Sequence, residues 1–210
     1  SESYFWLNNT GSLLNQTICG LFTGIPNYIM VPIAAKMVKK WGARATSIIA
    51  GLFGFFAYMT LFFVGFHPFG QTFKDHYIFN LIWVIFGLTI CGLPNKILNV
   101  SGQIVTAEAL DYMEWKHGLR NEALVTTVQG YFGKLATSVT GWLSGMVLTW
   151  INYVPLTDSL GNAVPQTDPT MLNGIWAVFC ILPALARGLY GVSFIIYPIH
   201  GDLQLSLIHI

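Results

Sequence analysis

Long apolar segments alternate with short polar ones along the whole chain. A helix needs about 20 mostly apolar residues to cross a bilayer, and five segments meet this requirement. We predict membrane-spanning helices at residues 12–37, 45–66, 77–106, 121–151 and 171–198. The pattern therefore predicts an all-α membrane protein.

The composition agrees with this pattern. Of 210 residues, 54% are hydrophobic and 9% are charged, whereas a soluble domain carries roughly 25% charged residues. The net charge of +1 gives no indication of a nucleic-acid partner. Cys19, Cys91 and Cys180 lie in apolar runs without a CxxC spacing, so we expect small buried residues rather than a disulfide framework.

The segments that connect the predicted spans differ in positive charge. The first and third connections are basic, whereas the second has only Lys74 and the fourth has neither Lys nor Arg. The basic residues of the first and third are Lys36, Lys39, Lys40, Arg44, Lys116 and Arg120. The positive-inside rule then predicts both connections in the cytoplasm, the N-terminus outside and the C-terminus inside.

The third of these connections is the most charged part of the chain. It contains Asp111, Tyr112, Glu114, Lys116, Arg120 and Glu122. We expect a cytoplasmic loop here, and two interpretations of it remain open. The loop is a latch whose ion pairs differ between conformational states, or its solvated charges only fix the topology.

The third span contains the helix-breaking sequence Gly92-Leu93-Pro94-Asn95 near its middle. We expect this sequence to interrupt the helix, because transporters build binding sites where helices are broken near the midplane. A plain kink is the alternative, since Gly and Pro are common in membrane helices.

Three cations, Lys96, Lys134 and Arg187, lie well inside predicted spans whose inner parts contain no Asp or Glu. A cation at a helix centre costs about 2.5–3.5 kcal/mol on insertion scales. Each therefore needs a water-filled cavity or a partner from helices outside this chain, from backbone carbonyls or from substrate. Snorkelling or an interhelical pair would also suit Lys96, and a structural pair would suit Arg187.

Lys134 lies deepest, about 11–14 residues into its helix, or near mid-bilayer at about 1.5 Å per residue. Its helical face carries small or polar residues, namely Thr127, Gly130, Ser138, Gly141 and Gly145. Such a face suits a cavity wall or a close helix contact. We expect Lys134, Thr127 and Ser138 to take part in binding substrate or coupling ion.

Three motifs carry a family resemblance. They are Asp111-Tyr112-x-Glu114-Trp115-Lys116-x-Gly118-x-Arg120-x-Glu122 with Gln129 and Gly133-Lys134, the tail Tyr197-Pro198-x-x-Gly201-Asp202, and Pro32-x-x-Ala35-Lys36-x-x-Lys39-Lys40-Trp41-Gly42-Ala43-Arg44. The first two resemble the glycoside–pentoside–hexuronide:cation symporters, the melibiose-permease branch of the major facilitator superfamily. The third is similar to the superfamily loop between the second and third helices of a half.

The resemblance implies most of the C-terminal half of a twelve-helix transporter, with residues 1–11 closing the extracellular side of the preceding helix. It implies coupled uptake of a sugar or glycoside with Na⁺ or H⁺ across the bacterial cytoplasmic membrane, and no other cofactor. Lys134 would then lie at the sugar and cation site, with Asn99 facing the same cavity. The cation-binding acids of the family belong to the N-terminal half, outside this chain.

Lys96 and Arg187 depart from the family pattern, because the melibiose permease carries uncharged residues there. Extra cations would suit an anionic sugar such as a hexuronide, and pairing with acids of the other half explains them equally well.

Two other functions remain alternatives. A lysolipid transporter of the same superfamily is one, and a polytopic membrane enzyme is the more distant one. For an enzyme, His67, Asp75 and His76 lack metal-ligand spacing. Residues 205–210 resemble a translated sequencing adapter, and we expect them to be a non-native tail.

Overall fold

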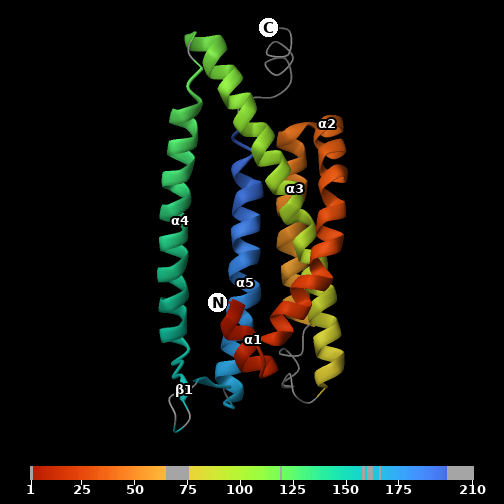
Figure 1. The fold of residues 1–210 in the computed structure, drawn as a ribbon, viewed down its shortest axis with the longest axis vertical. Coiled ribbons are helices and arrows are strands. Elements are labelled where there is room, and N and C mark those ends of the chain that lie inside the picture. The colour runs from red at the N-terminus through yellow and green to blue at the C-terminus, as the bar shows by residue number, and fades with distance from the viewer. Residues whose placement is uncertain are drawn as a thin grey trace.

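The computed structural model of the chain describes residues 2–64, 76–118, 120–157, 159, 163–165 and 167–197. Its helices are α1 (Glu2–Thr10), α2 (Leu14–Val64), α3 (Tyr77–His117), α4 (Glu122–Trp150) and α5 (Pro169–Ser193). Two-residue strands, β1 (Leu156–Thr157) and β2 (Ala163–Val164), pair antiparallel between α4 and α5. The long helices run along one common axis (Figure 1), and the predicted all-α membrane fold is confirmed.

α2 is two helices that meet at Gly42. This residue has φ 79° and ψ 160°, a backbone region that is essentially restricted to glycine. Cys19 and Leu61 belong to one core cluster, and Ala34 and Ala50 belong to another. Residues at similar distances before and after Gly42 therefore pack together, so the chain reverses there and the two parts run antiparallel. These parts match the first two predicted spans.

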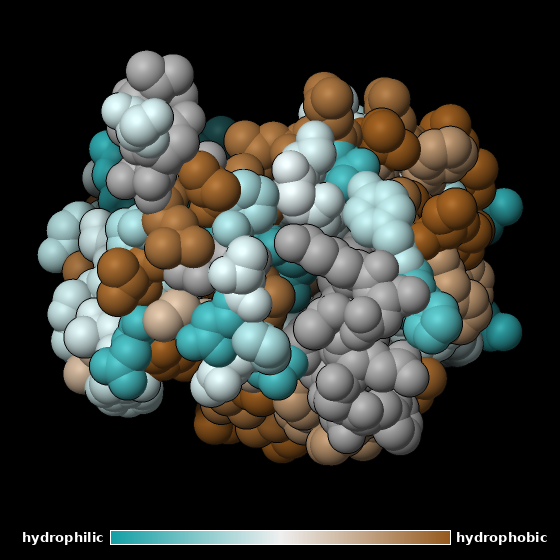
Figure 2. Space-filling view, turned by 90° about the horizontal axis from the view of Figure 1, so that it is seen from below, coloured by the Kyte–Doolittle hydropathy of each residue, from teal (hydrophilic) through white to brown (hydrophobic). Residues whose placement is uncertain are grey.

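Three helices, α2, α3 and α5, are long and apolar enough to cross a membrane. α4 has 29 residues, about 43 Å of helix, but its Thr, Ser and Gly residues make it less apolar. Its passage through the membrane stays a prediction. Seen from the end that carries β1, brown hydrophobic side chains lie mainly toward the rim and polar ones toward the middle (Figure 2).

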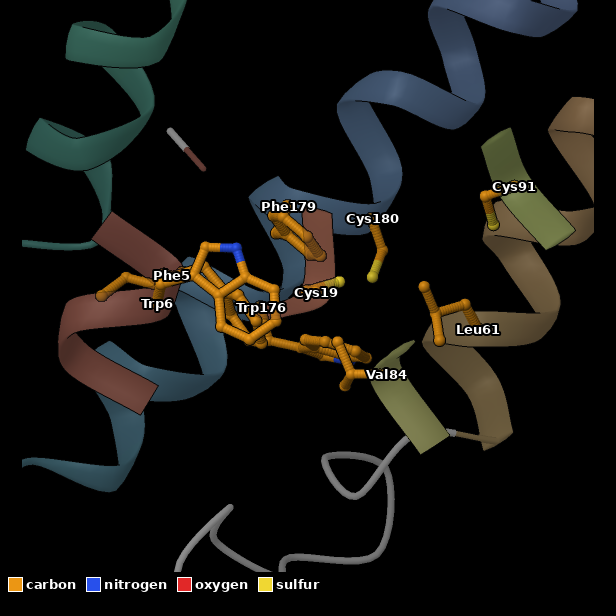
Figure 3. Packing of buried hydrophobic residues seen from close by; sticks show 10 residues of the cluster. Phe5, Trp6, Cys19, Leu61, Val84, Cys91, Trp176, Phe179 and Cys180 are labelled. Carbon is orange, nitrogen blue, oxygen red and sulfur yellow. The ribbon is translucent and has the colours of Figure 1, made fainter. Parts of the chain in front are cut away.

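Aromatic side chains join α1 to α5 in the main core. Phe5 stacks on Phe179 with ring centroids 4.3 Å apart, and Trp176 lies 5.4 Å from Phe5. Figure 3 shows this cluster continuing to Leu61, Val84 and the cysteines. Cys19, Cys91 and Cys180 are buried thiols, which confirms their interpretation as small core residues.

Two glycines bring the backbones of α2 and α5 into contact. A Cβ atom at Gly51 would lie 2.5 Å from the Cα of Gly191 and 2.9 Å from the carbonyl oxygen of Arg187. Any side chain at Gly51 would therefore push the two helices apart. This contact fixes the backbone of Arg187 against α2.

The predicted break in the third span is wrong. α3 is a continuous helix through Gly92-Leu93-Pro94-Asn95. A proline removes one backbone hydrogen bond, and neighbouring helices can compensate for it in a packed bundle. Gly92 serves packing instead, because a Cβ atom there would lie 2.6 Å from Nδ2 of Asn27 on α2.

The prediction that a loop follows residue 106 is also wrong, because α3 continues as a helix to His117. Gly118 ends it in the left-handed region, with φ 66°, and its N–H donates to the Glu114 carbonyl at 2.8 Å. The Asn121 side chain then caps α4 by accepting from the Leu124 N–H at 2.9 Å. Most of the charged stretch is thus helix that reaches beyond the neighbouring helices (Figure 1). Its Ala, Glu and Leu residues favour helix, and a bilayer core needs only about 20 of the residues.

α4 stands apart from the other helices (Figure 1). None of its residues is buried. It is tied to α3 where Nε2 of Gln129 donates to Oγ1 of Thr106 at 2.7 Å. At its other end Ile151 packs on α5, since a Cβ atom at Gly174 would meet Cγ2 of Ile151 at 2.8 Å.

Candidate functional site

A stripe of polar residues runs along one face of α3. It consists of Asn95, Asn99, Gln103 and Thr106. Successive members are three or four residues apart, which places them above one another on a helix. Together with α5 and with Gln129 of α4, this stripe forms a polar groove.

The groove has two adjoining parts. One, of about 270 Å³, is lined by Asn99, Pro183, Arg187 and Tyr190 among others. The other, of about 620 Å³, extends from Asn99 and Tyr190 to Gln103, Thr106 and Gln129. The larger part lies within the range of small-molecule sites, about 300–1,000 Å³, and the smaller part lies just below it.

Arg187 reaches from α5 to the head of the α3 stripe. Its Nη1 donates to Oδ1 of Asn95 at 2.8 Å, and its side chain is half-buried. An amide can accept this bond but does not neutralise the charge. α5 ends at Ser193, five residues before the predicted end, so Arg187 lies about 9 Å from the end of its helix rather than at mid-span.

Lys96 follows Asn95 directly but points elsewhere. Its Nζ lies 5.3 Å from the ring centroid of Tyr28 on α2. A cation over an aromatic face is attracted by the ring quadrupole. Lys96 therefore connects α3 to α2, which agrees with the expected interhelical pair. It does not line the polar groove.

Lys134 is exposed near the middle of α4, 12 residues after Glu122. Because Gln129 points toward α3, Lys134, five residues further on, projects about 140° away from that direction. The structure therefore separates Lys134 from Arg187 and Asn99. Thr127 and Ser138 are exposed on the Lys134 face, and Ser138 donates to the Lys134 carbonyl at 3.1 Å.

The expected close helix contact of the Lys134 face is not formed within the described part of the chain. Cβ atoms at Gly130, Gly141 and Gly145 would meet nothing within 4 Å. This face of α4 is therefore open within the described part of the chain.

Arg120 gathers the acidic residues at the α3–α4 junction. Its guanidinium lies 3.1 Å from Asp111, 3.2 Å from Glu114 and 3.0 Å from Glu122. The hydrogen bond to Glu122, followed by the one to Glu114, raises the pKa of Arg120, so the guanidinium stays charged at neutral pH. All four side chains are well exposed, and the network therefore connects two helix ends without a packed core beneath it.

Lys116 and Tyr112 form a second contact on the same end of α3. The Lys116 Nζ donates to the Tyr112 hydroxyl at 3.3 Å and lies 5.5 Å from its ring centroid. The six residues of the predicted cytoplasmic latch are thus brought together in two groups: Asp111, Tyr112, Glu114 and Lys116 lie on the end of α3, Arg120 lies in the short turn after it, and Glu122 begins α4.

Two further contacts hold the end of α5. Arg44, after the Gly42 reversal, donates from Nε to the Phe194 carbonyl at 3.1 Å and from Nη2 to the Ile195 carbonyl at 2.6 Å. Tyr197 donates to Glu108 at 3.0 Å. Burial, with the nearby Glu108 charge, raises the pKa of Tyr197, so this phenol stays protonated at neutral pH.

The sequence of residues 3–201 matches the family model described as MFS/sugar transport protein. The chain belongs to this family. The predicted membership of the major facilitator superfamily of sugar transporters is thereby confirmed, and the apolar helices and this family identify a multi-pass membrane protein.

Several relatives of this MFS/sugar transport chain carry transporter names. An uncharacterized symporter of Bacillus subtilis, YjmB, is 30% identical over 89% of this chain and 36% of its own length. A putative sulfoquinovose importer of Escherichia coli is 35% identical over 40% of the chain and 18% of its own length. An isoprimeverose transporter of Lactiplantibacillus pentosus is 28% identical over 48% of the chain and 20% of its own length.

The chain thus spans about a third or less of the length of these MFS relatives. No solved structure matches it.

The sequence does not predict a groove role for four residues of this MFS chain. They are Asn95, Gln103, Gln129 and Tyr190. The spacing of Asn95 and Asn99, one helical turn apart in an apolar span, is a signal that could have found the stripe, because intramembrane polar groups are costly. Part of the predicted tail motif, from Pro198 to Asp202, lies outside the described residues, as do His67, Asp75 and residues 205–210. Among the described residues no three His, Cys, Asp or Glu side chains gather as a metal site.

Proposed function

We propose that the protein containing this chain couples a Na⁺ or H⁺ gradient to the uptake of a sugar or glycoside in the bacterial cytoplasmic membrane. The observation that carries this proposal is the family match over residues 3–201. The relative named as a symporter and those named for sulfoquinovose and isoprimeverose support the substrate class. The chain supplies five helices of the C-terminal half, and the other half supplies the acids of the cation site.

The mechanism is alternating access, in which two halves of the protein rock around a site near the midplane. Lys134, with Thr127 and Ser138 on the same face, contacts the bound sugar and the acids of the cation site. Its exposure near the middle of α4 supports this role, because an ammonium at this depth needs partners. An ammonium can donate three hydrogen bonds to hydroxyls or carboxylates.

The polar groove, from which Lys134 points away, supplies a second and separate part of the substrate site. Asn99 and Arg187 line it, and the amide of Asn99 suits the hydroxyl groups of a sugar. Lys96 acts indirectly, because its contact with Tyr28 positions α3 against α2.

The α3–α4 junction is the cytoplasmic latch of this mechanism. Arg120 joins two acids of α3 to one acid of α4, and a planar guanidinium is suited to bridging several carboxylates. The latch pairs change when the two halves rock, so they bias one conformation over the other. Exposure of the latch makes this bias sensitive to salt.

The test is transport by the full-length protein in proteoliposomes. Radiolabelled sugars are added while a Na⁺ gradient, a pH gradient or neither is imposed, with ionophores that collapse each gradient as controls. We expect accumulation above the outside concentration with one gradient and equilibration without it. Equal uptake under all conditions would refute coupling, and transfer of fluorescent lysolipid without sugar uptake would favour the lysolipid alternative.

A further inference from the structure

Arg187 is a cation in an apolar helix whose charge has no acidic partner in the described part of the chain. Asp and Glu are absent from residues 3–74, 76–107, 123–157 and 169–201 of the sequence. The partner that the structure does supply, Asn95, is an uncharged amide. The polar groove therefore carries a net positive charge at the end occupied by Arg187.

Asn95 orients Arg187 without consuming its binding capacity. A guanidinium has five N–H donors in one plane, and Asn95 accepts from Nη1 alone. Because Arg187 also lines the groove, the remaining donors are available to a ligand there. A planar fork of this kind favours oxyacid anions, which it can bind through two parallel hydrogen bonds.

The rest of the groove suits a polyhydroxylated skeleton attached to that acid. Asn99 follows Asn95 by one turn, and Gln103, Thr106 and Gln129 continue the polar lining. Tyr190, one turn from Arg187, contributes an aromatic ring to both parts of the groove. An acid-binding end, a row of amides and hydroxyls, and one aromatic wall together match a sugar acid better than a neutral sugar.

We infer that the substrate is a sugar that carries a carboxylate or sulfonate group, and that Arg187, positioned by Asn95, binds this group. The inference rests on the proposed function of sugar transport and names the substrate class of that function. Arg187 is the specificity residue, and Asn95 is a positioning residue. Lys134 is not needed for this choice, because it projects away from the groove.

The experiment uses sugars of matched stereochemistry that differ in charge. D-glucose, D-glucuronate and 6-deoxy-6-sulfo-D-glucose differ only at C6, and D-galactose with D-galacturonate gives a second pair. Isoprimeverose serves as a neutral disaccharide. Uptake of each radiolabelled probe, and its competition against the others, is measured with the full-length protein in proteoliposomes.

We expect wild-type protein to bind an acidic probe at least about tenfold more tightly than its neutral counterpart. Arg187→Gln should weaken binding of the acidic probe about ten- to a hundredfold, as expected for loss of hydrogen bonds to a charged group, and should leave the neutral sugar within about threefold. Arg187→Lys, which keeps the charge and loses the fork, should fall between them. Lys39→Gln removes an exposed cation outside the groove and should change neither affinity.

Three outcomes would overturn the inference. They are equal wild-type affinity for acidic and neutral probes, uptake of isoprimeverose or hexoses alone, and an Arg187→Gln variant that loses both classes equally. Equal loss would show that Arg187 pairs with an acid elsewhere in the protein. If Arg187→Gln does not fold, the wild-type preference and Arg187→Lys decide the question. Absence of uptake of every probe would instead contradict the proposed function itself.

Discussion

Gly51→Ala tests the backbone contact that holds α5 and its Arg187 against α2. The added Cβ atom would lie 2.5 Å from the Cα of Gly191, and ordinary contact begins near 3.4 Å. The helices must therefore separate by about 1 Å, since close-packed interiors leave no spare room. Overpacking costs about 1–3 kcal/mol, partly offset by the higher helix propensity of Ala, about 0.5–1 kcal/mol. We expect a net loss of about 1–2 kcal/mol.

The assay uses the buried thiols of the chain as reporters. Cys19, Cys91 and Cys180 are buried thiols, so a maleimide dye that fluoresces on reaction detects them only when the helices open. Full-length protein, with cysteines outside this chain replaced, is heated with the dye in detergent. A loss of about 1–2 kcal/mol corresponds to a midpoint about 2–8 °C lower, on the scale for domains of 150–250 residues.

Two variants make the result specific. A Cβ atom at Gly20 on α2 would meet nothing within 4 Å, whereas one at Gly191 would lie 3.1 Å from the Cα of Gly51. We expect Gly20→Ala to keep or raise the midpoint, Gly191→Ala to lower it slightly, and Gly51→Ala to lower it most. A Gly51→Ala midpoint equal to that of Gly20→Ala would refute the close approach of α2 and α5.

Three further predictions concern Lys134, the α3–α4 junction and the contact of Tyr197 with Glu108. Lys134→Ala should abolish gradient-driven accumulation and leave the melting midpoint within about 2 °C, because this side chain is exposed; wild-type accumulation would remove Lys134 from the mechanism. Arg120→Ala should slow turnover with sugar affinity kept within about twofold, and added salt should mimic it by screening exposed pairs; lost equilibrium binding alone would contradict the latch. Tyr197→Phe should cost about 1 kcal/mol at pH 7 and pH 9. Since the folded pKa is raised, the hydrogen bond to Glu108 contributes fully below the unfolded value, about 10, and is lost as pH rises through the folded value. Melting curves across this range in which Tyr197→Phe matches wild type would exclude the contribution.

The helical elements could be predicted from the sequence because membrane helices satisfy their own backbone bonds, so apolar length alone defines them. Their ends could not. The sequence predicts the end of the third helix where charge begins, near residue 106, yet helix propensity carries α3 to His117, and Gly118, with its left-handed backbone, ends it. Apolar composition defines the part of a helix that lies in the membrane, whereas helix propensity and capping decide where the helix ends.

The candidate site, like the helices, could be predicted only in part. Lys96, Lys134 and Arg187 were recognisable singly, because a cation in an apolar span is costly. Their partners depend on packing between helices: Asn95 meets Arg187 across 92 positions of sequence, and Tyr28 meets Lys96 from another helix. Hydrophobic periodicity gives the buried face of a helix but not its rotation against a specific neighbour, so these pairs required the structure.

Lys134 and Arg187 are held so differently that they should respond to different perturbations. Arg187 is fixed by Asn95 and by the glycine contact of α5 with α2. Lys134 belongs to α4, which buries no side chain and is joined to α3 by Gln129 and the Arg120 network. Displacement of α4 would thus move Lys134 and leave the Arg187 end of the groove intact. Loss of the Arg120 network should therefore alter coupling to the cation while preserving discrimination between acidic and neutral sugars, and a variant that changes both together would contradict this separation.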